Sequence, residues 1–168
     1  MERISLNGLW QVSGSDGSTF SGTVPGCVHT DLFTAQEMFF EENARRVQSV
    51  EQNDYCYRRT FTVAAVGEDP VLVFEGLDTY CSIFLNGTKL GDGDDMFLTY
   101  RFPVQGILRS GKNELTVAFR SPVREVAGRP PRSGAFTTER LYTRRMQCTY
   151  GWDWVVRLVT MGIFRSCR

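Results

Sequence analysis

The chain has 168 residues, the length of one domain with a sizeable core, and its 42% apolar and 23% charged content excludes disordered, collagen-like and disulfide-scaffold proteins. No apolar run approaches the roughly 20 residues that span a bilayer, and the start lacks the apolar stretch of a signal peptide. We therefore expect a soluble, cytoplasmic protein with no membrane partner. The formal net charge is zero, but residues 1–119 carry −7 and residues 120–168 carry +7. Because no nucleic-acid-binding motif accompanies the basic part, we expect compensation within the molecule or by an acidic neighbouring domain, and no nucleic-acid partner.

The first half of the chain predicts strands separated by one helix. A helix is predicted from Val28 to about Met38, where apolar residues recur at helical spacing. Residues 39–54 are charged and follow no regular pattern, which predicts a connecting segment without regular secondary structure. In the segment 55–63, residues 57, 61 and 63 place aromatic and β-branched side chains on one face, with Arg59 as the exception. The full set of predicted strands is 9–13, 55–63, 71–75, 81–85, 98–104 and 114–120.

The second half predicts a hairpin and a long loop. Asn86-Gly87 lies between two apolar runs and is typical of a type I′ turn, which needs positive φ at both central residues. Residues 121–140 contain several Pro and Gly and read as a surface loop. A closing strand near residues 162–164 leaves few residues before Arg168, so we expect a piece cut from a longer protein. Short strands with long loops and one short helix predict an all-β fold, an antiparallel β-sandwich.

Cysteine and histidine usage argues against a metal site and a disulfide framework. The five cysteines are odd in number, widely spaced and without a Cys-x-x-Cys pair, so free thiols in a reducing compartment are expected. Cys27 and His29 are close in sequence, but His29 is the only histidine and two ligands fall short of zinc's usual three or four. The acidic turn at 92–95 does not fit a calcium loop, because Phe97 stands where the loop's Gly belongs. No cofactor and no metal are therefore expected.

The densest chemical signal is Trp152-Asp153-Trp154. Two indoles offer apolar platforms to the C–H faces of a sugar ring, and a carboxylate between them accepts hydrogen bonds from vicinal hydroxyls. The alternative is a strand with both tryptophans in the core and Asp153 in solvent or paired with an arginine. The residues alone fit both interpretations. No pair of carboxylates reads as the acid and nucleophile of a glycosidase.

Five segments, in order along the chain, resemble the N-terminal domain of β-mannosidases of glycoside hydrolase family 2. The resemblance covers nearly the whole chain, residues 1–168, and departs at Val155-Val156, where the family commonly has Gly-Pro. The path after the motif is therefore expected to differ. The segments are Leu6-Asn7-Gly8-Leu9-Trp10, Val24-Pro25-Gly26-Cys27-Val28-His29-Thr30-Asp31-Leu32, Phe74-Glu75-Gly76-Leu77-Asp78-Thr79 with Phe84-Leu85-Asn86-Gly87, Met96-Phe97 with Tyr100-Arg101-Phe102, and Gln147-Cys148-Thr149-Tyr150-Gly151-Trp152-Asp153-Trp154.

The resemblance implies a jelly-roll-like, galactose-binding-domain-like β-sandwich that packs against a (β/α)₈ barrel with two catalytic glutamates. That barrel is the expected partner, and without it the chain is expected to have no catalytic residues and no activity of its own. The parent enzyme would hydrolyse terminal β-D-mannosides. The resemblance assigns substrate positioning to Trp152, Asp153 and Trp154. The rival functions are a stand-alone carbohydrate-binding module and a structural or interaction sandwich in which both tryptophans are buried.

Overall fold

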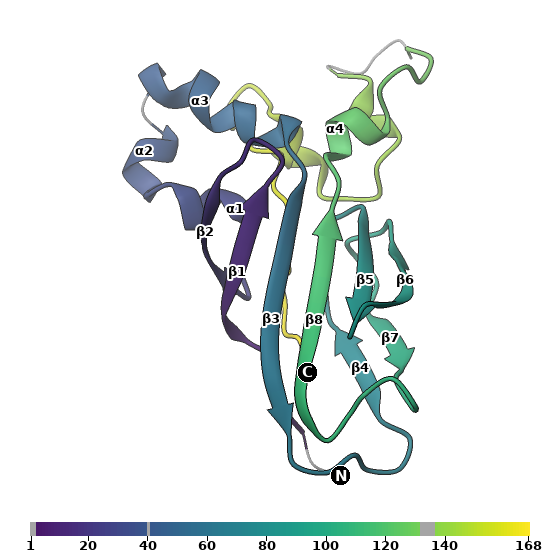
Figure 1. Ribbon diagram of the computed structural model, residues 1–168. Helices are drawn as coiled ribbons and strands as arrows, with labels where there is room; N and C mark the ends of the chain where they lie inside the picture. The colour runs from purple at the N-terminus through teal and green to yellow at the C-terminus, as the bar shows by residue number, and fades with distance from the viewer. Residues whose placement is uncertain (1–2, 40, 132–136) are drawn as a thin grey trace.

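The computed structural model describes residues 3–39, 41–131 and 137–168 and contains a six-stranded antiparallel sheet in the order β2-β1-β3-β8-β5-β6 (Figure 1). Its long central strands β3 and β8 pair along their whole length. The smaller sheet pairs β4 with β7, also antiparallel. The strands are β1 Gly8–Gly14, β2 Thr19–Val24, β3 Tyr55–Val63, β4 Val71–Phe74, β5 Cys81–Leu85, β6 Thr88–Gly93, β7 Tyr100–Pro103 and β8 Gly111–Phe119.

The last residues of the chain complete the second layer of the sandwich. Cys167 bridges Phe74 of β4, and Gly162 bridges Asp78, both antiparallel. On its other side the same segment accepts backbone hydrogen bonds from the chain near β1 and β2, for example from Leu6 to Cys167 at 2.9 Å. The segment 161–168 is therefore an extended chain held on both sides, and it runs behind the large sheet in Figure 1.

Side-chain alternation along the strands explains why the two layers pack together. In β3, Tyr55, Tyr57 and Val63 are buried, while the residues between them are partly or fully exposed. Arg59 shares the inward face, and its Nη1 donates to the carbonyl of Asn7 at 2.8 Å. The predicted face of this strand is confirmed, and its one polar exception is satisfied by a backbone carbonyl.

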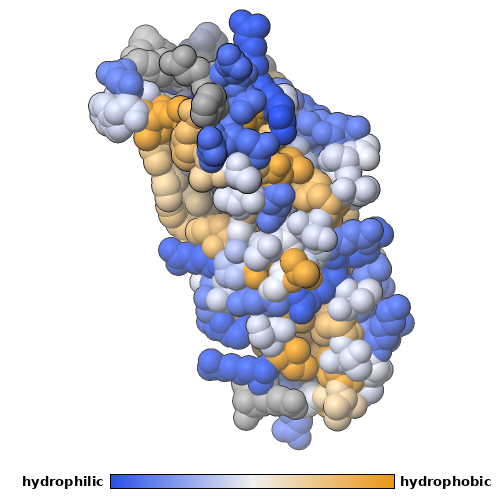
Figure 2. All heavy atoms as spheres, turned by 90° about the vertical axis from the view of Figure 1, so that its left-hand side faces the viewer, coloured by the Kyte–Doolittle hydropathy of each residue, from blue (hydrophilic) through white to orange (hydrophobic). Residues whose placement is uncertain are grey.

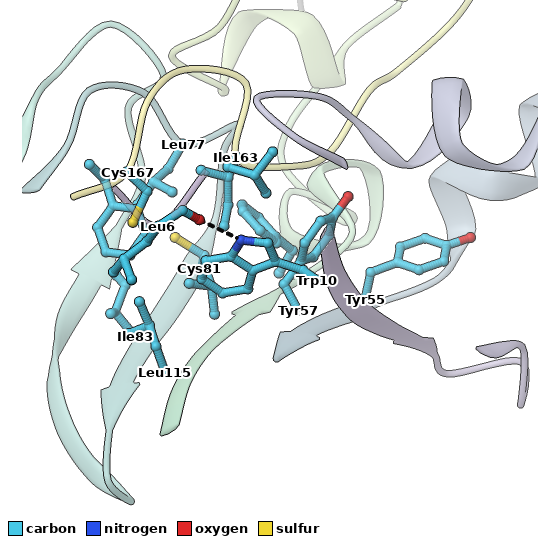
Figure 3. Close-up of a cluster of buried hydrophobic side chains, with 14 of the residues drawn as sticks. Leu6, Trp10, Tyr55, Tyr57, Leu77, Cys81, Ile83, Leu115, Ile163 and Cys167 are labelled. Atoms are coloured by element: carbon cyan, nitrogen blue, oxygen red, sulfur yellow. Dashed lines mark hydrogen bonds between the residues drawn. The ribbon is translucent and has the colours of Figure 1, made fainter. Parts of the chain in front are cut away.

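The core lies between the two layers and includes the chain's most buried tryptophan (Figure 3). Trp10 is almost fully buried, and its Nε1 donates to the carbonyl of Leu6 at 2.9 Å. Around it lie apolar side chains from both layers, among them Tyr57, Leu77, Ile83 and Ile163. The burial of these apolar side chains is the main favourable contribution to folding.

Helices gather at one end of the sandwich and are more numerous than the single one expected (Figure 1). The predicted helix is split, because Phe33 is extended and a second helix begins at Ala35, directly after Thr34. The backbone N–H of Thr34 donates to Glu37 Oε2 at 2.8 Å, while that of Glu37 donates to Thr34 Oγ1 at 3.3 Å, which is a capping box. The α-helices are α1 Val28–Leu32, α2 Ala35–Phe39, α3 Ala44–Ser49 and α4 Pro122–Glu125, with 3₁₀ turns at Glu41–Asn43, Val50–Gln52, Glu139–Leu141 and Gln147–Tyr150.

Two segments expected to be irregular therefore contain short helices. Helix α3 lies within 39–54, and α4 begins the expected loop 121–140. Ser121 caps α4, since its Oγ accepts from the backbone N–H of Arg124 at 3.1 Å, and Pro122 occupies the first turn. The part of that loop at 132–136 lies outside the described residues.

The uneven charge is compensated within the molecule. Among the described residues of the basic C-terminal part, five arginines pair with acidic residues of the first 119 residues, so the ion pairs tie the end of the chain to its beginning. The pairs are Arg124–Asp54, Arg144–Asp95, Arg145–Asp78, Arg157–Glu51 and Arg168–Glu75.

The surface on the β2 side is mostly hydrophilic or neutral, with separate hydrophobic groups (Figure 2).

Candidate functional site

The Trp-Asp-Trp tip, residues 152–154, forms the end of a narrow arm at the helical end of the sandwich. Trp152 and Val155 exchange backbone hydrogen bonds of 3.0 and 3.2 Å, so Asp153 and Trp154 are the two central residues of a tight turn. The backbone N–H of Leu158 donates to Thr149 at 2.9 Å and continues the pairing towards the base. The two paired segments of the arm, 149–152 and 155–158, thus carry the tip at their end.

Gly151 allows the arm to leave the 3₁₀ turn at Gln147–Tyr150. Its φ of +86° lies in the left-handed region that side chains disfavour. A Cβ at this position would also approach the Cβ of Arg157 on the returning strand to 3.3 Å. A glycine is therefore needed directly before the tip, both for the backbone conformation and for the close approach of the two strands.

The tip is exposed to solvent, which contradicts the alternative in which both tryptophans lie in the core. The exposed fraction is 39% for Trp152 and 78% for Trp154. Their ring centroids are 5.8 Å apart and the ring planes meet at 59°. Asp153 is exposed between them in sequence. The three predicted site residues therefore lie together at a projecting turn, with apolar ring surface and a carboxylate available to a ligand.

Arg157 anchors the base of the arm to two other elements. Its Nε and Nη2 contact both carboxylate oxygens of Glu51 at 2.8–3.1 Å, and Nη2 also contacts Glu139 at 2.8 Å. Burial lowers the pKa of Arg157, but the Glu51 and Glu139 carboxylates outweigh it and raise that pKa overall. Such charge-assisted, two-pronged contacts are stronger than neutral hydrogen bonds and fix the orientation of both partners.

Tyr150 lies between two arginines where the arm begins. The guanidinium carbons of Arg145 and Arg157 are each 5.5 Å from the centroid of its ring, within the range of cation–π attraction. Arg145 is fully buried and pairs with Asp78 at 3.0 Å, and both side chains contact Thr160. Because an unpaired buried charge is costly, this network holds the arm in one position.

Arg140 supports the tip directly and was not predicted from the sequence. It comes from the 3₁₀ turn Glu139–Leu141, and its Cζ lies 5.1 Å from the centroid of the Trp152 ring. Its Nη2 donates to the carbonyl of Gln147 at 3.1 Å. The only signal for these contacts is the excess of arginine after residue 119, which predicts ion pairs but not their partners.

The other sequence candidates lie apart from the tip. His29 is buried, with 1% of its surface exposed, and burial together with the charge of Arg145 lowers its pKa to about 4. The Sγ of Cys27 lies 3.6 Å from Thr30 Oγ1. In the acidic turn, Asp92 contacts Ser82 and Lys89, and Asp95 pairs with Arg144.

Within 3–39, 41–131 and 137–168, no three His, Cys, Asp or Glu side chains gather as metal ligands would. All five cysteines are free thiols, with Cys148 exposed near the arm. Among the helices that the structure describes, none has the length and apolar character to cross a bilayer.

A groove of about 990 Å³ lies at the opposite end of the sandwich from the tip. Its lining is mainly apolar and comes from the end of β3, the loop to β4 and the two chain ends, including Phe61, Val66, Val71 and Arg168. None of the tip residues lines it. The groove and the tip are therefore separate features of the molecule.

Comparison with known proteins agrees with the fold. Residues 10–165 match the family model described as the glycosyl hydrolase 2 galactose-binding domain-like family. β-Mannosidase from Bos taurus is 30% identical over 98% of this chain and 21% of its own length, and β-mannosidase B from Thermothelomyces thermophilus is 34% identical over 84% and 18%. The crystal structure of β-D-mannosidase from Dictyoglomus thermophilum superposes with a TM-score of 0.87 at 38% identity, covering 99% of this chain and 22% of that one.

These relatives are much longer than the present chain, which spans about a fifth of their length. In them the matched region is one part of a larger protein. The family model covers almost all of the present chain and both sheets of the sandwich. The chain belongs to the galactose-binding-like N-terminal domains of glycoside hydrolase family 2 and is homologous to the corresponding part of β-mannosidases.

Proposed function

We propose that this chain is the non-catalytic sugar-binding domain of a retaining β-mannosidase that hydrolyses terminal β-D-mannosides. Trp152, Asp153 and Trp154 would form one wall of the pocket for the sugar, and a (β/α)₈ barrel of the same enzyme would supply the two catalytic glutamates. The observation that carries the proposal is the projecting turn, in which two partly exposed indoles flank an exposed carboxylate. The names of the relatives support mannosides as the sugar class.

The chemistry of the tip suits a sugar. Indole faces pack against the C–H groups of a pyranose, while a carboxylate accepts hydrogen bonds from neighbouring hydroxyls. A single wall encloses little of the ligand, and small-molecule sites bind well when they bury most of it. The isolated chain is therefore expected to bind mannose or mannobiose with millimolar affinity or weaker, about −4 kcal/mol or less favourable. It is expected to show no hydrolysis of a β-mannoside.

The test is a titration of the ¹⁵N-labelled chain with mannobiose, followed by the indole and backbone N–H signals. Signals of Trp152, Asp153 and Trp154 are expected to shift, and Trp154→Ala and Asp153→Asn should abolish the shifts. Leu141→Ala is the matched control, because Leu141 is an exposed apolar residue at the same end but outside the tip. Shifts that survive in both tip variants would contradict the proposal. Saturable micromolar binding by the isolated chain would favour a stand-alone carbohydrate-binding module.

A further inference from the structure

The two tryptophans of the tip differ in their surroundings. Trp154 has twice the exposed fraction of Trp152, at 78% against 39%. The guanidinium of Arg140 lies over the ring of Trp152, with its Cζ 5.1 Å from the centroid. One face of Trp152 is therefore occupied by a protein cation, whereas Trp154 presents most of its surface to solvent.

Arg140 is itself unusual among the arginines of this end. It is 8% exposed, and in the part of the chain that the structure describes it takes part in no salt bridge, although its neighbour Glu139 pairs with Arg157. Its named contacts are the ring of Trp152 and the carbonyl of Gln147, at the beginning of the arm. A nearly buried cation with these partners links the 3₁₀ turn at Glu139–Leu141 to both the base and the tip of the arm.

A guanidinium over an aromatic ring restricts the ring beneath it. A planar cation lying over an indole is attracted by the negative face of the ring and holds it in one orientation. Trp154 stands 5.8 Å from Trp152, so a fixed Trp152 in turn limits the positions open to Trp154. Because the face of Trp152 under Arg140 is closed to a ligand, the ring with free surface for stacking is Trp154.

We propose that Arg140 is a positioning residue for sugar binding: it covers one face of Trp152, and Trp152 braces Trp154, which stacks on the sugar. This inference rests on the proposed function, in that the ligand is the same mannoside. It adds a division of roles within the tip, with Arg140 and Trp152 as support and Trp154 as the contact surface. Preorganisation of this kind raises affinity by reducing the ordering cost of binding.

The first test needs no sugar. Two neighbouring indoles give an exciton couplet in far-ultraviolet circular dichroism, whose size depends on their mutual orientation. Trp154→Phe identifies the couplet by removing it. Arg140→Met keeps the length of the side chain but removes the planar cation. Without the cation–π attraction, the Trp152 ring is expected to adopt more orientations, and the couplet should fall to less than about half of its wild-type size. Arg129→Ala is the matched control, since Arg129 lies over Tyr142 instead, at 5.8 Å.

The second test measures mannobiose binding in the same variants. Arg140→Met is expected to weaken binding by about fivefold, equivalent to about 1 kcal/mol, with Arg129→Ala at the wild-type value. Wild-type affinity in folded Arg140→Met, whatever the size of its couplet, would overturn the inference. So would retention of binding in Trp154→Ala combined with its loss in Trp152→Ala. If Arg140→Met does not melt cooperatively, Arg140→Lys decides by the same criteria, because it keeps the charge but has no planar face.

The two proposals fail in different ways. If no variant, including the wild type, shows sugar-induced shifts, the proposed function fails while the couplet still tests the support of Trp152 by Arg140. If sugar binding depends on Trp154 but not on Arg140, the proposed function stands and the positioning role is wrong.

Discussion

At the scale of single residues, the burial of His29 affects how the stability of the domain responds to pH. His29 is buried near the charged Arg145, and its pKa is lowered from 6.5 to about 4, first by burial and then by that charge. In the unfolded chain the imidazole titrates at its ordinary value. The folded domain therefore excludes a proton that the unfolded chain accepts between about pH 4 and 6.5.

The first prediction concerns this window. As the pH falls from 6.5 to 4, the unfolded state gains a proton and the folded state does not, so the free energy of unfolding should fall. His29 alone is expected to account for a loss of up to about 3 kcal/mol, with no further loss once both states are protonated. Urea denaturation at a series of pH values, followed by circular dichroism, measures this loss.

His29→Gln provides the control for that experiment. The variant lacks the titrating group, so its stability should change less steeply than that of the wild type between pH 6.5 and 4. Contributions from other groups, such as the raised pKa of the half-buried Asp31 carboxyl, are present in both proteins and cancel in the difference. Parallel curves for the two proteins would show that His29 is not the group responsible.

At the scale of elements, features that depend only on residues close together in the sequence were predictable. The Asn86-Gly87 turn joins β5 to β6 with φ values of 51° and 81°, as its residues predict. The inward face of β3 also follows from its alternation. The three tip residues could be named as a site candidate because two indoles and a carboxylate are adjacent in sequence, but the residues alone fitted an exposed tip and a core strand equally well.

Features that depend on partners distant in sequence were not predictable. Strand β2 has a mixed composition, and it forms because β1 pairs with it over six residue pairs. Arg140 and Arg157 support the arm through residues such as Glu51, which lies 106 positions from Arg157. The split between α1 and α2 did have a local signal, the Thr34 and Glu37 capping box, which the apolar spacing of residues 28–38 concealed.

The second prediction tests the Asn86-Gly87 turn that joins β5 to β6. Gly87 has a φ of +81°, and no atom lies within 4 Å of where its Cβ would be, so Gly87→Ala meets backbone strain without a clash. We expect a loss of about 1 kcal/mol in the free energy of unfolding, measured by urea denaturation. Gly67→Ala is the matched control: it too has open space, but its φ lies outside the left-handed region, so its stability should be unchanged or slightly higher. Equal losses in both variants would contradict this explanation.

At the scale of the whole molecule, the chain is closed by contacts between its two ends. The segment 161–168 places Met161, Ile163 and Cys167 in the core and carries hydrogen bonds to both neighbours. Arg168 pairs with Glu75, which directly follows β4 in the same layer. The ion pairs described above join the same C-terminal part to the first 119 residues. The sandwich is therefore expected to unfold as one unit rather than layer by layer.

The third prediction follows from this closure. Removal of residues 161–168 exposes the apolar faces that Met161 and Ile163 cover and leaves the backbone of β4 unpaired on that side. Each large buried apolar side chain is worth about 1.5–3 kcal/mol, and domains of this size are stable by only about 5–15 kcal/mol. The chain 1–160 should therefore lose its cooperative thermal transition and the dispersion of its amide signals.

Point variants in the full chain test the same segment. Ile163→Ala should lower the free energy of unfolding by about 2–5 kcal/mol, whereas Arg165→Ala, on an exposed residue of the same segment, should change it by no more than about 0.5 kcal/mol. A folded chain 1–160 with a wild-type melting curve would mean that the segment is an appendage, and that the two sheets hold together without it.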